Sequence, residues 1–340
     1  MVLYRRDLLP HLNSLVSNQM SSKVSVSELK RYGDVHRDEL GVTILAKEGR
    51  NVYTLKVLAK SSVIDHGDEQ RIMEEVKLLQ MITKSICIPV VKETFQDRNF
   101  LYVLFEEAVA CNLDSIIQDP RVTLDEGMAK HVVMCCLDAL EIIHSKGVIY
   151  NGISSESLLV SHDGYILLNN FRFSKESSDS SAMSTYVFGS VKYRSPEIVE
   201  NQGFGIASDF WALGVLIYEC ITRETPFASY GQYDEDIYER IVRHQFNSIN
   251  LHSGMSREGH AIVNKLLNPD PLDRLGGAGA RSVKKDIWFS GLAALGKHKE
   301  LSANAKRHLK TALASRDATT KLPFNGNADD PMFWKHFQYS

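Results

Sequence analysis

A change of hydrophobic pattern between residues 105 and 123 divides the chain into two unlike parts. Before it, three runs rich in β-branched and aromatic residues predict strands: GVTILAK, NVYTLKVLA and FLYVLFEE. The segment 68–82 places Ile72, Val76, Leu79 and Ile82 at helical spacing. These features predict a small, mostly antiparallel sheet that carries one helix.

After residue 123 the apolar residues recur at helical spacing. A long amphipathic helix is predicted to begin after Asp125 and to stop at Gly147. The run ASDFWALGVLIYECITRE is apolar on nearly every face, which predicts a buried helix, and REGHAIVNKLLN predicts another amphipathic one. We therefore predict an α+β, bilobal fold. Its expected parts are an N-terminal helix and linker (1–28), a small lobe (29–105), a large, mainly helical lobe (106–291) and a C-terminal tail (292–340).

Composition excludes several classes of protein. A net charge of −3 gives no electrostatic reason to expect nucleic acid or an anionic membrane as a partner. The sequence has neither a run of about 18 apolar residues nor an N-terminal apolar core of secretory type. Its five cysteines lack C-x-x-C spacing, which is typical of reduced thiols used for packing. We expect a cytoplasmic protein with no membrane or nucleic-acid partner.

Five motifs follow one another in a fixed order: NVYTLKVLAK, a glutamate in the next helix, GSVKYRSPEIV, SDFWALGVLIYE and DPLDRLGG. In this order they resemble the protein kinase family, in particular the cyclic-nucleotide-dependent branch of the AGC group, over about residues 30–290. The resemblance implies the bilobal kinase fold and ATP-dependent phosphate transfer to protein.

The resemblance places a nucleotide site between the lobes. Lys56 falls on the strand lysine that holds the phosphates and Glu75 on its helix partner; an ammonium aligned by a carboxylate is what a phosphate clamp needs. A solvated strand lysine is the alternative for Lys56. The remaining positions of this vestigial site are Val42, Phe105, Glu107 and Leu159.

The phosphate-covering loop departs from the family. Its three glycines fall on Val35, Arg37 and Leu40, and Asp34, Asp38 and Glu39 lie nearby. Glycine serves there because backbone amides must approach phosphate oxygens with no Cβ in the way. The sequence therefore predicts a poor phosphate cradle.

The catalytic positions are vacated. Gly152 replaces the carboxylate that accepts the substrate proton, Ser154 the lysine that steadies the phosphoryl group, and Ser157 the amide that holds a metal. The metal-binding D-F-G reads Asn170-Phe171-Arg172. Loss of a general base alone removes about 10²–10⁴ in rate, and Mg²⁺ prefers hard, charged oxygen ligands. We expect no catalytic residue and no metal site; Glu156 and Asp163, the nearest acids, are not expected to take over.

Scaffold positions of the family are retained. Asp209 matches the acid that anchors the catalytic-loop backbone, and Glu197 should pair with Arg274 inside the large lobe. Tyr150 and Phe171 belong to an apolar column between the lobes, with Leu79 and Val91. The sequence thus specifies a packed kinase fold without its chemistry.

Both ends and one loop carry further signals. Thr185 and Tyr186 lie where relatives carry a regulatory phosphate, but the arginine that receives it is Asn151, so a flexible loop is expected. Phe333, Trp334 and Phe337 lie near the end of the sequence. They are consistent with three alternatives: a tail that fills the cleft near Phe105, Glu106 and Glu107, a motif that docks a partner, or a disordered tail. Residues 3–19 resemble the last helix of a cyclic-nucleotide-binding domain. The chain also loosely resembles the kinase-like domain of plant fusions of phosphatase, cyclic-nucleotide-binding and kinase domains.

These signals favour a pseudokinase, a regulatory or protein-binding module of a larger protein. Its partner would be another protein or a fused cyclic-nucleotide-binding or phosphatase domain. No cofactor is expected, with weak, Mg²⁺-independent ATP binding left open by Lys56 and Glu75. The first alternative is an atypical serine/threonine kinase that reads a basic peptide through Glu156 or Glu219. The second is a structural domain whose cleft is filled by its own tail.

Overall fold

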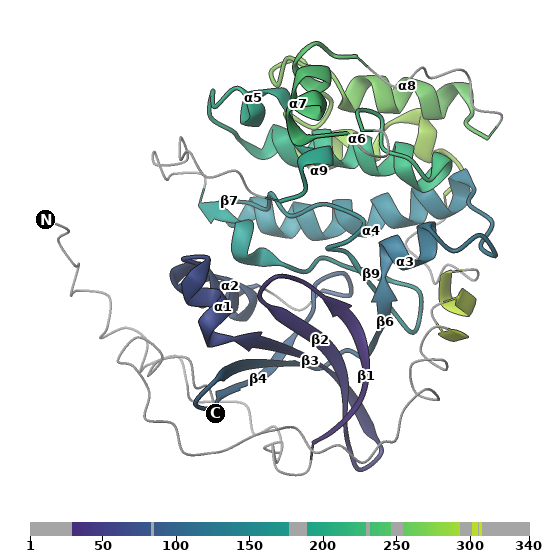
Figure 1. Ribbon diagram of the computed structural model, residues 1–340. Helices are drawn as coiled ribbons and strands as arrows, with labels where there is room; N and C mark the ends of the chain where they lie inside the picture. The colour runs from purple at the N-terminus through teal and green to yellow at the C-terminus, as the bar shows by residue number, and fades with distance from the viewer. Residues whose placement is uncertain are drawn as a thin grey trace, which may run out of the picture.

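The computed structural model describes residues 29–82, 85–176, 189–228, 232–245, 254–292, 301–304 and 306–307. The expected N-terminal helix, Thr185 and Tyr186, and the three tail aromatics lie outside these residues. Two lobes are seen in Figure 1, a β-rich one at the bottom and a helical one at the top.

The small lobe is an antiparallel sheet of five strands in the order β1-β2-β3-β5-β4. Its elements are β1 (Lys30–Arg37), β2 (Gly41–Glu48), β3 (Asn51–Ala59), α1 (Lys60–Asp65), α2 (Glu69–Met81), β4 (Val91–Gln96) and β5 (Phe100–Phe105). The three predicted strands and the helix over 68–82 are confirmed. Strands β1 and β4 and helix α1 were not predicted, because the two strands lie at the sheet edges, where polar residues are favoured and the apolar signal is weak.

The large lobe is mainly helical. Its helices are α3 (Leu113–Ile117), α4 (Glu126–Ser145), α5 (Pro196–Val199), α6 (Ile206–Thr222), α7 (Asp234–Val242), α8 (Arg257–Leu266) and α9 (Ala280–Lys284). Its short strands are β6 (Val109–Asn112), β7 (Val148–Ile149), β8 (Leu159–Ser161), β9 (Ile166–Leu167) and β10 (Lys175–Glu176), and β6 contacts β1 of the small lobe. The described part of this lobe also contains the 3₁₀ turns η4 (Phe171–Phe173), η6 (Val191–Tyr193) and η7 (Ile287–Phe289).

Local signals explain where the long helices begin and end. The Asp125 side chain accepts a hydrogen bond from the Met128 amide at 2.7 Å, and Gly147, at φ +71°, ends the turn after α4. Helix α6 is buried on nearly every face, as predicted, and packs against α4 and α8. Among the described residues no helix is long and apolar enough to cross a bilayer. All five cysteines are buried and unpaired.

Candidate functional site

The strand lysine and the helix glutamate meet between the sheet and α2. Lys56 Nζ lies 3.0 and 2.9 Å from the two carboxylate oxygens of Glu75, and each side chain is 4% exposed. The same carboxylate accepts a hydrogen bond from the Phe171 amide at 3.1 Å. Lys56 is therefore a buried, paired lysine rather than a solvated one, and Glu75 connects β3 to η4.

Asp209 organises the backbone where a catalytic loop would lie. Its carboxylate accepts hydrogen bonds from the Asn151 amide at 2.7 Å and the Tyr150 amide at 3.0 Å, and His144 Nε2 lies 2.8 Å from it. The ring of Tyr150 packs edge-on against Phe171 at 5.0 Å between centroids, and its hydroxyl donates to the Asn169 carbonyl. The frame of the site is thus fully built.

Gly152 stands against the ring of Tyr150. A Cβ at this position would lie 2.8 Å from Tyr150 Cζ and 3.1 Å from Cε1 and Oη. Tyr150 is fully buried and cannot swing into solvent. The position that would carry a proton-accepting carboxylate therefore has no room for a side chain.

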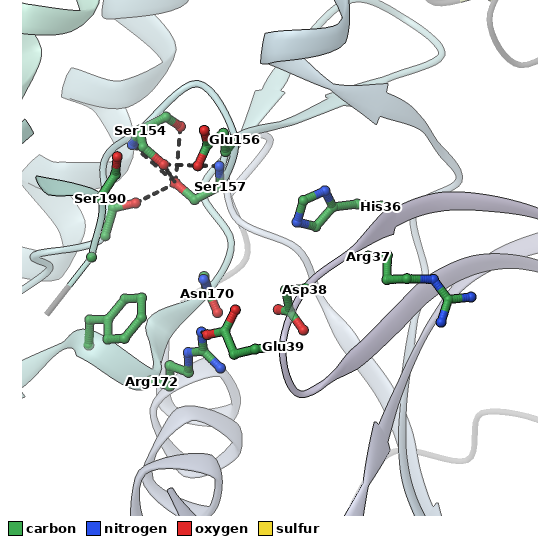
Figure 2. Close-up of a pocket in the computed structure, with 13 residues that line it drawn as sticks. His36, Arg37, Asp38, Glu39, Ser154, Glu156, Ser157, Asn170, Arg172 and Ser190 are labelled. Carbon is green, nitrogen blue, oxygen red and sulfur yellow. Dashed lines mark hydrogen bonds and ion pairs between the residues drawn. The ribbon is translucent and has the colours of Figure 1, made fainter. Parts of the chain in front are cut away.

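Ser154 and Ser157 line the cleft but are hydrogen-bonded to each other. Their hydroxyl oxygens lie 3.0 Å apart, and each hydroxyl also accepts the other residue's amide at 3.1 Å. The Ser157 hydroxyl donates further to the Gly152 carbonyl. Both hydroxyls are used to close their own loop (Figure 2).

Arg172 occupies the position after Phe171 as a buried cation. Its side chain is 3% exposed and forms an ion pair with Glu39 from the β1–β2 turn, with Asp68 3.6 Å away on its other side. The guanidinium also lies over the Phe173 ring, 4.7 Å from the centroid. Figure 2 shows Arg172 and Glu39 meeting beside Asn170, whose side-chain oxygen is buried without a hydrogen-bond partner. A positive charge is thus fixed beside Asn170, the residue at the position of the family's metal-binding acid.

The turn between β1 and β2 satisfies its own amides. The Asp38 carboxylate accepts hydrogen bonds from the amides of Leu40 and Gly41, both at 3.0 Å. In a phosphate cradle such amides point at the ligand. Gly41 is needed for sheet packing, because a Cβ there would lie 2.0 Å from the Val57 carbonyl oxygen of β3.

Side chains of the small lobe also cover the end of the cleft where the base of a nucleotide would be expected to bind. Val35 packs onto a cluster of Leu159, Val109 and Leu167. His36 Nδ1 lies 3.3 Å from the side-chain nitrogen of Asn112 in the large lobe. These contacts draw β1 down onto β6 and β8.

The other predicted nucleotide residues serve the joint between the lobes. Val42 packs against the core of the sheet, and Phe105 is buried. The Glu107 carbonyl accepts from the Thr54 hydroxyl at 2.6 Å, and its carboxylate accepts from the Val90 amide at 2.9 Å. Glu107 is thus already engaged within the chain.

A cavity of about 420 Å³ remains between the β1–β2 turn and the vacated loop. Three acids line it: Asp38, Glu39 and Glu156. Asp38 caps its turn and Glu39 pairs with Arg172, so Glu156, which is exposed, is the acid left to face the cavity. Asp163 does not line this cavity; it lies in the turn after β8, with its carboxylate 3.5 Å from His162.

The residues present do not fit a metal-bound triphosphate. The described residues hold no group of three or more His, Cys, Asp or Glu side chains arranged for a metal. The neutral Asn170 replaces the expected acid, the Arg172 guanidinium is fixed two residues further on, and the hydroxyls of Ser154 and Ser157 are bonded to each other. The Lys56–Glu75 pair, in contrast, is complete.

The retained ion pair of the large lobe is also formed. Arg274 Nη1 and Nη2 lie 2.7 and 2.9 Å from the Glu197 carboxylate oxygens, and Ser208 donates to the same carboxylate. Burial alone would raise the pKa of Glu197, but the hydrogen bonds and charge of Arg274 outweigh it and lower that pKa. Glu219, in contrast, is buried beneath Tyr193, whose hydroxyl donates to it, and burial raises its pKa. Glu219 is therefore not presented to a peptide.

Fold and site together define a class of protein. The sequence profile of the protein kinase domain family matches residues 39–289, which is well over half of the chain. The chain therefore belongs to the protein kinase family. Its curated relatives include cGMP-dependent protein kinases, of the cyclic-nucleotide-dependent branch of the AGC group.

Three relatives illustrate the match. Human cGMP-dependent protein kinase 2 is 27% identical over 274 residues, which cover 79% of this chain and 35% of that protein. Isozyme 1 of Drosophila melanogaster is 29% identical over 243 residues (71% and 31%). The kinase egl-4 of Caenorhabditis briggsae is 31% identical over 243 residues (70% and 32%). The chain spans about a third of the length of these relatives.

Sequence reasoning missed three contacts of this site: Glu39–Arg172, His36–Asn112 and the Asp38 cap. The cap has a local signal, since an aspartate often accepts hydrogen bonds from amides two or three residues further on. The other two join residues far apart in the sequence and have no local signal.

Proposed function

We propose that this chain is a catalytically inactive protein-kinase-like module that acts by binding, as a regulatory part of a larger, cyclic-nucleotide-regulated protein. It would work on a protein partner or on a fused phosphatase or cyclic-nucleotide-binding domain. The observation that carries the proposal is the buried Arg172 guanidinium, held by Glu39 two residues after Asn170, the neutral side chain at the position of the family's metal-binding acid.

Three features of the site support this proposal. The ring of Tyr150 blocks Gly152, the position of the proton-accepting residue. Ser154 and Ser157 are bonded to each other, and Asp38 caps the amides of the β1–β2 turn. Each of them removes a different requirement of phosphoryl transfer: proton acceptance, charge stabilisation and phosphate positioning. Restoring any one alone should restore little, because such groups act as a unit.

Calorimetry with ATP, with and without Mg²⁺, tests the proposal. We expect weak or no ATP binding, unchanged by Mg²⁺, and no transfer of the γ-phosphate to a basic peptide. ATP binding that requires Mg²⁺, together with phosphate transfer that Lys56→Ala abolishes, would overturn it.

An atypical serine/threonine kinase is the second candidate, favoured by one observation. The Lys56–Glu75 pair and its bond to the Phe171 amide are complete. In such an enzyme Glu156 is the acid at the cavity that remains to accept a proton. Phosphate transfer that is lost in Glu156→Gln, while the variant keeps its thermal stability, would support this candidate over the first.

A further inference from the structure

Two buried cysteines meet at the contact between the lobes. Cys87 lies in the turn between α2 and β4 of the small lobe, and its carbonyl accepts a hydrogen bond from the Leu168 amide of the large lobe at 2.9 Å. Cys135 lies in the middle of α4, and the Cys87 thiol donates a hydrogen bond to its sulfur. Both side chains are fully buried. The two thiols therefore connect a turn of the small lobe to a helix of the large one.

The sulfur of Cys135 is surrounded by hydrogen-bond donors. Besides the Cys87 thiol, the Ile166 amide donates to it, and His131 Nε2 lies 3.7 Å away. The same nitrogen of His131 lies 2.9 Å from the Gly164 carbonyl, so this nitrogen carries the proton and the ring is held beside the sulfur. Several donors that converge on one sulfur stabilise its thiolate form.

These donors give Cys135 an acidity unlike that of the other thiols. The hydrogen bond from Cys87 and the one from His131 hold the pKa of Cys135 below its ordinary value, although burial acts in the opposite direction. The hydrogen bond to Cys135, together with burial, raises the pKa of Cys87, and burial raises the pKa of the three remaining cysteines. Because the thiolate is the form that attacks, Cys135 is the nucleophile of the pair and Cys87 is the neighbouring thiol that receives the second step.

We propose that Cys87 and Cys135 form a reversible disulfide when the chain meets a hydroperoxide, and that this bond ties the two lobes together. Thiol reductants of the glutathione type would reverse it by thiol–disulfide exchange. The disulfide forms whether or not the chain transfers phosphate, so it stands apart from the proposed function.

The oxidation takes two steps and consumes one hydroperoxide. The Cys135 thiolate attacks one peroxide oxygen, the O–O bond breaks, and the departing hydroxide takes up the proton that the thiol had given up, which leaves Cys135 as a sulfenic acid. The sulfur of Cys87 then attacks the sulfur of Cys135; the S–S bond forms, the S–O bond breaks, and the hydroxyl leaves with the Cys87 proton as water. The two thiols together lose two electrons, and hydrogen peroxide is reduced to two molecules of water.

The turn that carries Cys87 gives the oxidant a route to the buried pair. This turn is closed by an isolated bridge between Ser85 and Ile88, whose backbone hydrogen bond is long at 3.4 Å, and by the Ser85 hydroxyl, which accepts from the Cys87 amide at 3.2 Å. Ile86, inside the turn, is 53% exposed. Few and long hydrogen bonds at the surface open at a small cost in free energy. We therefore expect disulfide formation to be limited by opening of this turn and to become faster in urea below the unfolding transition.

Peptide mapping of the full chain tests the proposal. The reduced chain is treated with hydrogen peroxide under native conditions, its remaining thiols are blocked, and it is digested with trypsin without reduction. Cleavage after lysine releases Cys87 in residues 85–92 and Cys135 in residues 131–146. Mass spectrometry should find these two peptides linked through Cys87 and Cys135, and dithiothreitol should separate them. The oxidised chain should also unfold roughly 5–15 °C above the reduced chain, because the bond closes a long loop of the unfolded chain.

Matched variants separate the roles of the two thiols. Cys87→Ala should abolish the linked peptide and leave a sulfenic acid on Cys135 that dimedone labels. Cys135→Ala should abolish the link and leave Cys87 unlabelled. The control Cys111→Ala changes a buried cysteine whose pKa is raised to about 12 by burial, and the Cys87–Cys135 link should form in it as in the parent. The peptide map of the parent chain decides the proposal even where a variant does not fold.

Three results would overturn the proposal. The first is a parent chain that yields no linked peptide after peroxide, or one linked through Cys136 instead of Cys135. The second is equal dimedone labelling of Cys87 and Cys135 in the two single variants. The third is a disulfide that forms but leaves the Tm of the chain unchanged, since the bond would then not tie the lobes together.

Discussion

Restoring the missing carboxylate by Gly152→Asp should damage the protein instead of activating it. The added Cβ would lie 2.8 Å from a carbon of the Tyr150 ring, closer than real Cβ contacts. Tyr150 is held by the Asp209 carboxylate at its amide, the Asn169 carbonyl at its hydroxyl and Phe171 against its ring. Neither the Tyr150 ring nor the backbone at residue 152 can move away without displacing the apolar column that connects the lobes.

Overpacking of this kind costs about 1–3 kcal/mol. For a domain of this size about 1 kcal/mol corresponds to roughly 2–4 °C in Tm, so a fall of about 2–12 °C is expected. Gly152→Ala separates the two causes, because it adds the Cβ without a charge; it should account for most of the loss. Thermal unfolding and urea titration measure both variants.

Gly205→Asp is the matched control. Gly205 is the N-cap of α6, and a Cβ there meets no heavy atom within 4 Å. Aspartate is favoured at an N-cap, so this variant should be as stable as the parent or more so. If Gly152→Ala and Gly152→Asp unfold at the parent's temperature, or if Gly152→Asp gains phosphate transfer, the steric reasoning is wrong.

Three further predictions concern the ion pairs. Lys56→Met should destabilise the fold by about 3 kcal/mol in urea titration, because it leaves the buried Glu75 carboxylate without a cation; an unchanged midpoint would contradict a structural role. Glu39→Gln should lower the free energy of unfolding by only about 1 kcal/mol, since Glu39 is 51% exposed, but it should speed amide hydrogen exchange in β1 and β2. The control Arg37→Gln, at a residue that is 68% exposed, should leave this exchange unchanged. Arg274→Leu should cost about 3–5 kcal/mol at neutral pH. Because folding lowers the pKa of Glu197, the Glu197–Arg274 pair stabilises the fold fully above the unfolded pKa of about 4.3, and this stabilisation is lost as the pH falls through the folded-state pKa. The Tm difference between the parent and Arg274→Leu should therefore narrow below about pH 4. A Tm difference that stays constant with pH would refute the pairing.

The parts of this structure that the sequence predicted are those with a local or ordered signal. The Lys56–Glu75 and Glu197–Arg274 pairs follow from motif order, and α4 and α6 from helical spacing and caps. The Glu39–Arg172 pair joins residues 133 positions apart across two lobes, so it depends on how far the lobes close. The contact between Gly152 and Tyr150 depends on a ring orientation that spacing does not specify.

The carboxylate of Asp38 has a consequence for any nucleotide that reaches this cleft. It already accepts the amides of Leu40 and Gly41 that an anionic ligand would need. Because it is tethered within the same turn, its effective concentration stays constant however dilute the protein is. A nucleotide must therefore displace the Asp38 carboxylate from these two amides before they can bind its phosphates. Raising the ATP concentration fills such a site far less than it fills a turn whose amides are free.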